Sequence, residues 1–156
     1  VPRLDRTEAV LTQVMNMRKV RSYATTSHTA ETHVFEMGPG GPGAELHVVV
    51  DPNMGPARPG AGGVHHVAFR TPDQDSLRLW IDRVTQAGIR SSGEVERFYF
   101  TSLYFREPNG ILFEIATDVP GFATDEPMES LGETLSLPPF LEGQRASIEA
   151  NLKPLV

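Results

Sequence analysis

The fold is decided by residues 64–118, VHHVAFRTPDQDSLRLWIDRVTQAGIRSSGEVERFYFTSLYFREPNGILFEIATD. This stretch opens with a predicted strand at 64–70. A helix is expected at 73–87, because Leu77, Ile81 and Val84 recur at helical spacing before Gly88 ends the pattern. Three more strands are expected at 93–99, 101–106 and 111–116. The order is one strand, one helix and three strands.

The N-terminal residues repeat this order without its first strand. A helix is predicted at 7–17, with Val10, Val14 and Met17 on one face and Asn16 at its end. Strands are expected at 18–24, 32–37 and 45–50. Val1 falls where an opening strand would be ending. We therefore expect that the natural protein has residues upstream of Val1.

The two repeats predict an α+β fold of tandem βαβββ modules. Their strands are expected to curve into an incomplete β-barrel with the helices outside, the first module lacking its opening strand. The strand at 64–70 is expected to be buried on both sides. The predicted units are a first module at 1–51, a Pro/Gly linker at 52–63, a second module at 64–118, and a C-terminal arm at 119–156 that ends in a helix at about 141–152.

The composition excludes several classes of protein. The net charge is −6, whereas nucleic acids and anionic membranes call for basic surfaces. The sequence contains no Cys, so it predicts no disulfide and no thiolate metal site. No apolar run approaches the roughly 18 residues that a membrane span needs, and no signal-peptide pattern is present. We expect a cytoplasmic protein with a small-molecule partner.

A His and a Glu stand out as candidate metal ligands. Strand periodicity places His66 and Ala68 on one face of the strand at 64–70. Glu114 interrupts the apolar run Ile111–Ala116, where an unpartnered carboxylate would be costly. Imidazole and carboxylate together suit divalent iron, manganese or zinc. The alternatives remain open, since strand His residues are often hydrogen-bonded or exposed, and a strand Glu often lies at an exposed edge.

Two motifs give the sequence a family resemblance. GVHHVAFR at 63–70 opens the second module and PNGILFEIATD at 108–118 closes it. With this module order they resemble the vicinal-oxygen-chelate superfamily, which includes glyoxalase I, extradiol dioxygenases and fosfomycin-resistance proteins. The tail LPPFLEGQRASIEANLKPL at 137–155 more narrowly resembles ring-cleaving dioxygenases of the hydroquinone 1,2-dioxygenase group. The resemblance covers nearly the whole chain.

The resemblance implies roles for five residues. His66 and Glu114 align with metal ligands, and His65 aligns with a position beside them where imidazole could move a proton. Tyr104 and Arg97 align with residues that face the substrate. Their ordinary alternatives are a half-buried strand aromatic and a solvated strand arginine.

The resemblance also implies that one metal ligand is missing from this sequence. The family's site is a facial triad of two His and one carboxylate. The other His belongs to the opening strand of another module, which we expect upstream of Val1. His47 occupies a place in the first module near that of Glu114 in the second, and a packed or exposed strand His is its ordinary interpretation. His28 and His33 carry no spacing signal.

The expected function is that of the C-terminal half of a non-haem Fe(II)-dependent ring-cleaving dioxygenase of extradiol type. It would act on hydroquinone-like or catechol-like aromatics with O2, and Mn(II) or Zn(II) are the alternative metals. The chain alone is expected to be inactive. The competing functions are a glyoxalase-like isomerase or lyase and a metal-free binding module. An unpaired strand edge in the first module predicts a homo-oligomer or edge pairing with another chain.

Overall fold

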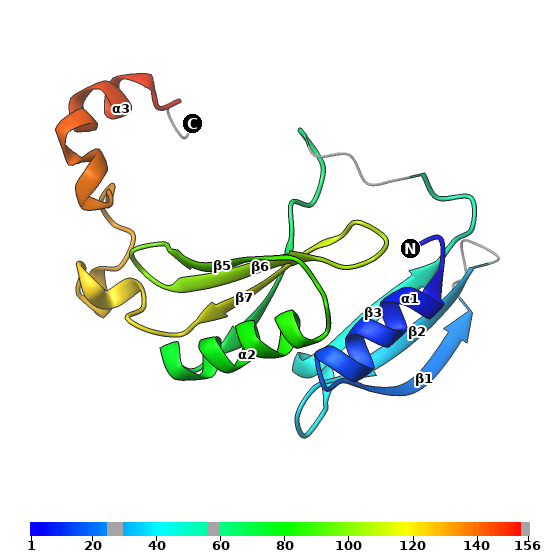
Figure 1. Cartoon of the computed structure of the whole chain (residues 1–156). Helices are drawn as coiled ribbons and strands as arrows, with labels where there is room; N and C mark the ends of the chain where they lie inside the picture. The colour runs from blue at the N-terminus through cyan, green and yellow to red at the C-terminus, as the bar shows by residue number, and fades with distance from the viewer. Residues whose placement is uncertain (25–29, 56–59, 154–156) are drawn as a thin grey trace.

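The computed structural model describes residues 1–24, 30–55 and 60–153, which form two β-sheets with helices packed against them (Figure 1). The first sheet has the strand order β1-β2-β3 and the second β4-β7-β6-β5. Strand β4 runs parallel to β7, and all other neighbours are antiparallel. The strands are β1 (Arg18–Ala24), β2 (Glu31–Glu36), β3 (Glu45–Val50), β4 (Val67–Thr71), β5 (Ser91–Glu96), β6 (Thr101–Arg106) and β7 (Leu112–Thr117).

This arrangement confirms the predicted α+β fold of two tandem modules. Each module has a helix followed by three strands, and within the described residues only the second has an opening strand. The described strands do not close into a barrel. β1, β3 and β6 have the predicted bounds, whereas β2, β5 and β7 are displaced by one to three residues from theirs.

The N-terminal helix differs from the predicted span 7–17. It consists of α1 (Leu4–Ala9), which continues into a π-helical turn, η1 (Val10–Val14). The chain then leaves the helix through Asn16, whose φ of 57° lies in the left-handed region that Asn tolerates. Asn16 has the left-handed conformation predicted for it, but the helical turns end at Val14 and begin three residues earlier than the apolar spacing indicates.

The second helix, α2 (Gln74–Gln86), lies close to its predicted bounds because both of its ends have local signals. The side chain of Asp73 accepts a hydrogen bond of 2.8 Å from the backbone N–H of Ser76, which caps the first turn. Gly88 follows the helix with a φ of 71°, a conformation that Gly adopts without strain. Hydrogen bonding to Ser76 lowers the pKa of the Asp73 carboxyl.

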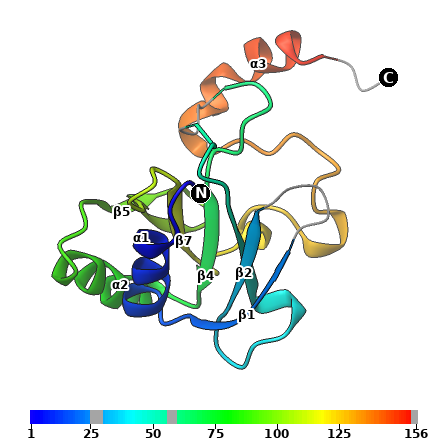
Figure 2. The ribbon, with the colours of Figure 1, turned by 90° about the vertical axis from the view of Figure 1, so that its right-hand side faces the viewer.

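The apolar core lies between the helices and one face of each sheet (Figure 2). In the second module, Leu77 and Val84 of α2 pack with Phe69, Phe113 and Ile115 from the sheet. In the first module, the core side chains are Val10, Leu11, Val14, Phe35 and Val48. The opposite face of the second sheet, which carries Glu114, is called the open face below.

Strand β4 corrects two expectations. It begins at Val67, so His65 and His66 precede the strand and do not belong to it. It is also an edge strand, and only the side chains on its helix-facing side are buried: Phe69 and Thr71 are buried, whereas Ala68 and Arg70 are exposed. The expectation of burial on both sides was wrong because a helix covers only one face of this sheet.

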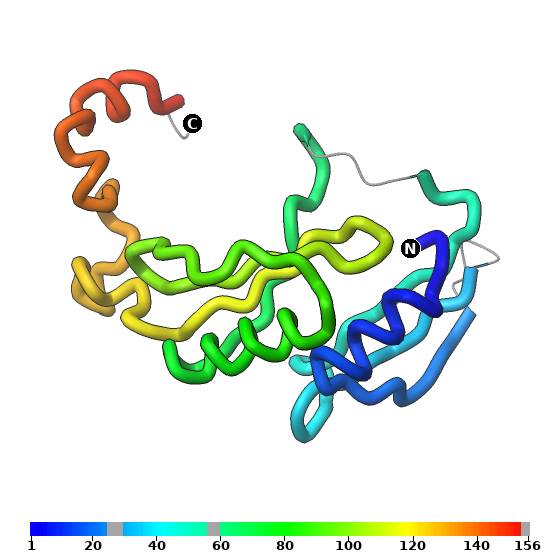
Figure 3. The backbone as a smooth tube through the Cα atoms, viewed as in Figure 1, coloured from blue at the N-terminus to red at the C-terminus, as the bar shows by residue number. Residues whose placement is uncertain are grey.

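The C-terminal arm leaves the second sheet and projects away from both modules (Figure 3). It contains three short 3-10 helices, η3 (Phe122–Thr124), η4 (Met128–Ser130) and η5 (Pro139–Gln144), followed by α3 (Arg145–Asn151). The predicted helix at 141–152 is therefore divided between η5 and α3. A further 3-10 turn, η2 (Pro42–Ala44), lies between β2 and β3. No helix in the described part of the chain is long and apolar enough to cross a membrane.

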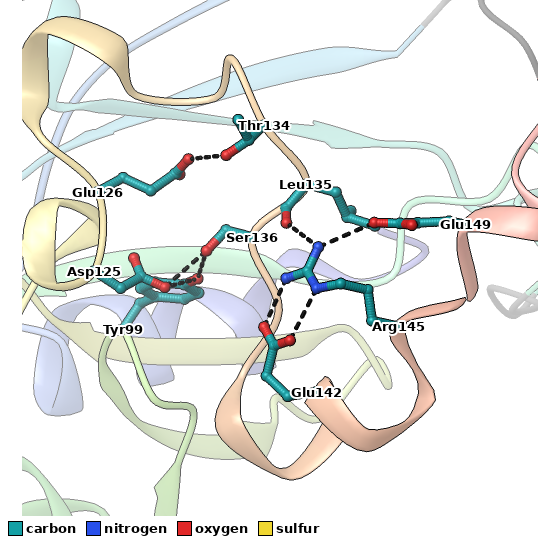
Figure 4. A network of polar contacts seen from close by, with 9 residues as sticks. All are labelled: Tyr99, Asp125, Glu126, Thr134, Leu135, Ser136, Glu142, Arg145 and Glu149. Carbon is teal, nitrogen blue, oxygen red and sulfur yellow. Dashed lines mark hydrogen bonds and ion pairs between the residues drawn. The ribbon is translucent and has the colours of Figure 1, made fainter. Parts of the chain in front are cut away.

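The arm is attached to the second sheet at the turn between β5 and β6 (Figure 4). The hydroxyl of Tyr99 donates to Asp125 and lies 2.9 Å from the hydroxyl of Ser136. Further along, the Arg145 guanidinium joins Glu142, Glu149 and the carbonyl of Leu135. These contacts give the arm a defined path over the end of the β5–β6 hairpin.

Candidate metal centre

Glu114 lies on the central strand β7 with its carboxylate on the open face. Its neighbours Phe113 and Ile115 point to the opposite face, into the core under α2. Glu114 is only 3% exposed, so its carboxylate needs partners in place of water. The partners come from the residues that lead into β4 and from the other adjacent strand, β6.

His66 reaches Glu114 from the β4 side. Ala68 is the register partner of Glu114, and His66 lies two residues before it, at the entrance to β4. The Nε2 atom of His66 is 2.7 Å from Oε2 of Glu114. The structure therefore brings together the two candidate ligands proposed from sequence, although His66 is outside the strand.

Two hydroxyl groups reach Glu114 from the β6 side. Tyr104 is the direct register partner of Glu114, so the two side chains lie on the same face of the sheet. The hydroxyls of Tyr104 and Ser102 each donate to Oε1 of Glu114 at 2.5 Å. Sequence reasoning missed Ser102. Its only signal was a position two residues before Tyr104 on the same strand face.

Arg97 and His65 form the outer part of the centre. The Nε of Arg97 donates to the Tyr104 hydroxyl at 3.3 Å, and its guanidinium lies 5.2 Å from the centroid of the Tyr104 ring. The Nδ1 of His65 is 2.9 Å from Nδ1 of His66. His65 thus contacts the ring nitrogen that does not face Glu114. All five residues chosen from sequence lie in one connected group, which Ser102 completes.

The donor set is suited to a divalent transition metal. Imidazole nitrogen and carboxylate oxygen are ligands for iron, manganese and zinc. Oε1 of Glu114 is occupied by hydroxyls, while Oε2 and the Nε2 of His66 are directed at each other. No group of three or more His, Asp or Glu side chains in the described ranges is placed to hold an ion. The site therefore offers two protein ligands.

His47 occupies the corresponding place in the first module. The backbone N–H of Asp51 donates to the Val1 carbonyl, just as that of Asp118 donates to the Thr71 carbonyl beside β7. His47 and Glu114 each lie four residues before these aspartates. Val1 therefore has the same position beside β3 that Thr71, the last residue of β4, has beside β7.

His47 is nevertheless held within the first module. Its Nδ1 lies 2.9 Å from the Tyr23 hydroxyl, and its Nε2 lies 2.8 Å from Glu45. Among the described residues it makes no contact with His66 or Glu114. His33 is buried on β2, with its Nε2 3.5 Å from Glu31. His28 lies outside the described residues.

The chain is similar to known proteins both in sequence and in fold. Residues 1–115 match the model of the Glyoxalase/Bleomycin resistance protein/Dioxygenase superfamily. A crystal structure of a "putative dioxygenase" from Bacillus subtilis subsp. subtilis str. 168 has a TM-score of 0.81 and 34% sequence identity. That match covers 97% of this chain and 46% of the other.

Relatives of this chain with assigned names are also dioxygenases by name. The Bacillus subtilis (strain 168) protein named "Putative ring-cleaving dioxygenase MhqA" is 44% identical over 155 residues, covering 99% of this chain and 49% of the relative. The chlorohydroquinone/hydroquinone 1,2-dioxygenase of Sphingobium indicum is 35% identical over 114 residues, covering 70% of this chain and 35% of the relative. The chain thus spans about half or less of the length of these relatives.

Proposed function

Because this chain belongs to the glyoxalase/bleomycin resistance protein/dioxygenase superfamily, we propose that it supplies the metal-binding half of a ring-cleaving dioxygenase. The reaction would be an extradiol-type cleavage of hydroquinone-like or catechol-like aromatics by O2. The metal would be Fe(II), with Mn(II) or Zn(II) as alternatives. The relative from Sphingobium indicum, whose name specifies hydroquinone substrates, supports this choice of substrate class.

The observation that carries the proposal is the contact of His66 with Glu114 on the open face. His66 Nε2 and Glu114 Oε2 would hold the metal. Since the described residues offer two ligands, a third protein ligand would come from outside them. Bound iron would supply coordination positions for an aromatic oxygen and O2, and would pass electrons between them.

The surrounding residues have separate tasks. Tyr104 presents a hydroxyl beside the metal position, where it can donate to an oxygen of the substrate. Arg97 is exposed and contacts Tyr104 through Nε, so its guanidinium could donate from a terminal N–H group to a substrate oxygen beside Tyr104. His65 accepts or donates at Nδ1 of His66, which orients the ligand ring and offers a route for a proton.

The test uses the protein as its gene encodes it, loaded anaerobically with Fe(II). We expect O2 consumption with hydroquinone in a one-to-one ratio with ring-opened product. Glu114→Gln should abolish this consumption and weaken Fe(II) binding, because it removes the anionic ligand. Glu94→Gln is the matched control, since Glu94 lies on β5 and pairs with Arg78 of α2.

The competing functions predict different results. A glyoxalase-like isomerase would act on a thiohemiacetal without consuming O2, and a metal-free binding module would bind aromatics equally well after Glu114→Gln. Either result would contradict the dioxygenase proposal. Homo-oligomerisation through the strand edge beside which an opening strand would pair, that of β3, belongs to the same proposal and is measured by light scattering.

A further inference from the structure

The two oxygens of the Glu114 carboxylate have different surroundings. Oε1 accepts from Ser102 and Tyr104, both at 2.5 Å, and Oε2 lies 2.7 Å from Nε2 of His66. The distances to the hydroxyls are typical of O–H donors bonded to an ionised carboxylate. One oxygen is thus held by two hydroxyls while the other faces His66.

The sheet register explains this asymmetry. β7 lies between β4 and β6, so the β4 side delivers His66 and the β6 side delivers the two hydroxyls. Tyr104 pairs with Glu114, and Ser102 pairs with Ala116, two residues further along the same face. Both hydroxyls therefore approach the carboxylate from one side, opposite His66.

The two donors differ in their access to solvent. Ser102 is 0% exposed, whereas Tyr104 is only half-buried and also contacts Arg97. The Tyr104 hydroxyl can turn to water or to a substrate oxygen. The buried Ser102 hydroxyl has no such alternative, because leaving Glu114 would leave it without a partner.

We propose that Ser102 is a positioning residue for Glu114. Its hydroxyl holds Oε1, so that Glu114 binds the metal through Oε2 alone and keeps its place when Tyr104 turns to the substrate. This inference rests on the proposed function, since it requires a metal at His66 and Glu114. Hydrogen-bond partners of metal ligands contribute about tenfold to a hundredfold to metal affinity.

The first module provides a matched control for Ser102. In the β2–β3 pair, Thr32 pairs with Val49 and Val34 pairs with His47, the counterpart of Glu114. Thr32 therefore holds the register position that Ser102 holds in the β6–β7 pair. It is 1% exposed, and its hydroxyl has no hydrogen-bond partner among residues 1–24, 30–55 and 60–153. Thr32→Val removes a buried hydroxyl from the equivalent place without touching the candidate centre.

The experiment measures binding of Mn(II) to the gene-encoded protein by electron paramagnetic resonance, with calorimetry as a second readout. Ser102→Thr and Ser102→Val give side chains of similar size, of which only the first keeps the hydroxyl. We expect Ser102→Val to raise the Kd for Mn(II) by about tenfold or more. For Ser102→Thr and Thr32→Val, the Kd for Mn(II) should stay within about twofold of that of the unaltered protein. This is well below the change expected when a hydrogen-bond partner of a metal ligand is lost.

The outcomes separate this inference from the proposed function. If the unaltered protein binds Mn(II) no better than Glu114→Gln does, the metal centre itself is wrong and the inference fails with it. If the unaltered protein binds Mn(II) well and Ser102→Thr and Ser102→Val bind equally, only the role of Ser102 is overturned. A loss of binding in Ser102→Val that Ser102→Thr restores supports the positioning role, because a purely steric defect would affect both variants.

Discussion

Glu114 is the residue around which the candidate centre is arranged. A buried carboxylate loses its hydration and must recover that free energy from donors or a cation. Here Ser102, Tyr104 and His66 provide the contacts, and two of the three are held by strand register. These contacts fix the orientation of the carboxylate, which would lower the entropic cost of binding the proposed metal.

Arg97 gives a prediction at this scale. Arg97→Gln removes the hydrogen bond to the Tyr104 hydroxyl and the cation over the Tyr104 ring. We expect the KM for hydroquinone to rise by roughly threefold to tenfold, the equivalent of one hydrogen bond. The Kd for Mn(II) should not change, because Arg97 contacts neither metal ligand directly.

Steady-state O2 consumption together with Mn(II) binding checks this prediction, and Arg90→Gln is the control for loss of an exposed Arg on the same module. Arg97→Lys should not restore the KM, since an ammonium group lacks the planar shape that stacks on Tyr104. An unchanged KM in Arg97→Gln would remove Arg97 from the substrate side of the site.

At the scale of secondary structure elements, an ion pair spans all three strands of the first sheet on the face that carries His47. Arg21 on β1 reaches across β2 to Glu45 on β3, with two N–O distances of 2.9 and 2.8 Å. Hydrogen bonds from Arg21 and then from His47 lower the pKa of the Glu45 carboxyl from 4.5 to about 2. The same group thus links the three strands and His47.

Arg21→Gln should raise the pKa of Glu45 from about 2 towards 4.5. Since the folded pKa is below the unfolded pKa, Glu45 stabilises the native state fully above pH 4.5. This contribution is lost as the pH falls towards 2. The decrease in the free energy of unfolding caused by Arg21→Gln should therefore be greatest at neutral pH. It should become smaller as the pH falls from 4.5 towards 2.

Carboxyl-carbon chemical shifts of Glu45, followed by NMR across this pH range, measure the pKa directly. Urea denaturation at several pH values measures the stability difference between Arg21→Gln and the unaltered protein. A Glu45 midpoint that remains near 2 in Arg21→Gln would show that Arg21 is not the cause of the shift.

At the scale of the whole molecule, the two modules are joined through the N-terminal helix. At one end, the hydroxyl of Thr7 donates to the buried Glu107 at 2.6 Å, and the Asn109 side chain donates to Thr7 at 2.7 Å. At the other end, the Arg83 guanidinium of α2 donates to the carbonyls of Gln13 and Val14. Polar contacts at both ends of the helix therefore connect modules that are distant in sequence.

Thr7→Val tests the first of these junctions. It removes the hydroxyl that donates to the buried Glu107 carboxylate and accepts from the Asn109 amide, so that Glu107 keeps the Ile111 N–H and Asn109 keeps the Arg3 carbonyl. We expect the free energy of unfolding to fall by about 1–3 kcal/mol, as for the loss of a buried hydrogen bond. Thr12→Val is the control, because the Thr12 hydroxyl bonds only to a carbonyl of its own helix. It should change the stability by within about 0.5 kcal/mol.

Urea denaturation measures both variants, and Mn(II) binding in the folded state should be the same for both as for the unaltered protein. If Thr7→Val is no less stable than Thr12→Val, the Thr7–Glu107 contact does not hold the modules together.

The sequence by itself determined the order of elements and the candidate ligands. Amphipathic periodicity over 73–87 and the signals at Asp73 and Gly88 are local, so they can be recognised without knowing the fold. Glu114 was conspicuous because its neighbours are apolar. The roles of His66, Tyr104 and Arg97 depended on resemblance to a family, since spacing alone does not show which residues meet.

Only the tertiary structure decided what surrounds these residues. His66 reaches Glu114 from outside β4 because the parallel pairing of β4 with β7 places its end there. Ser102 became part of the centre through the register of β6 with β7, and the exposure of β4 followed from its position at the sheet edge. These features arise from pairing between segments far apart along the chain, which local periodicity does not encode.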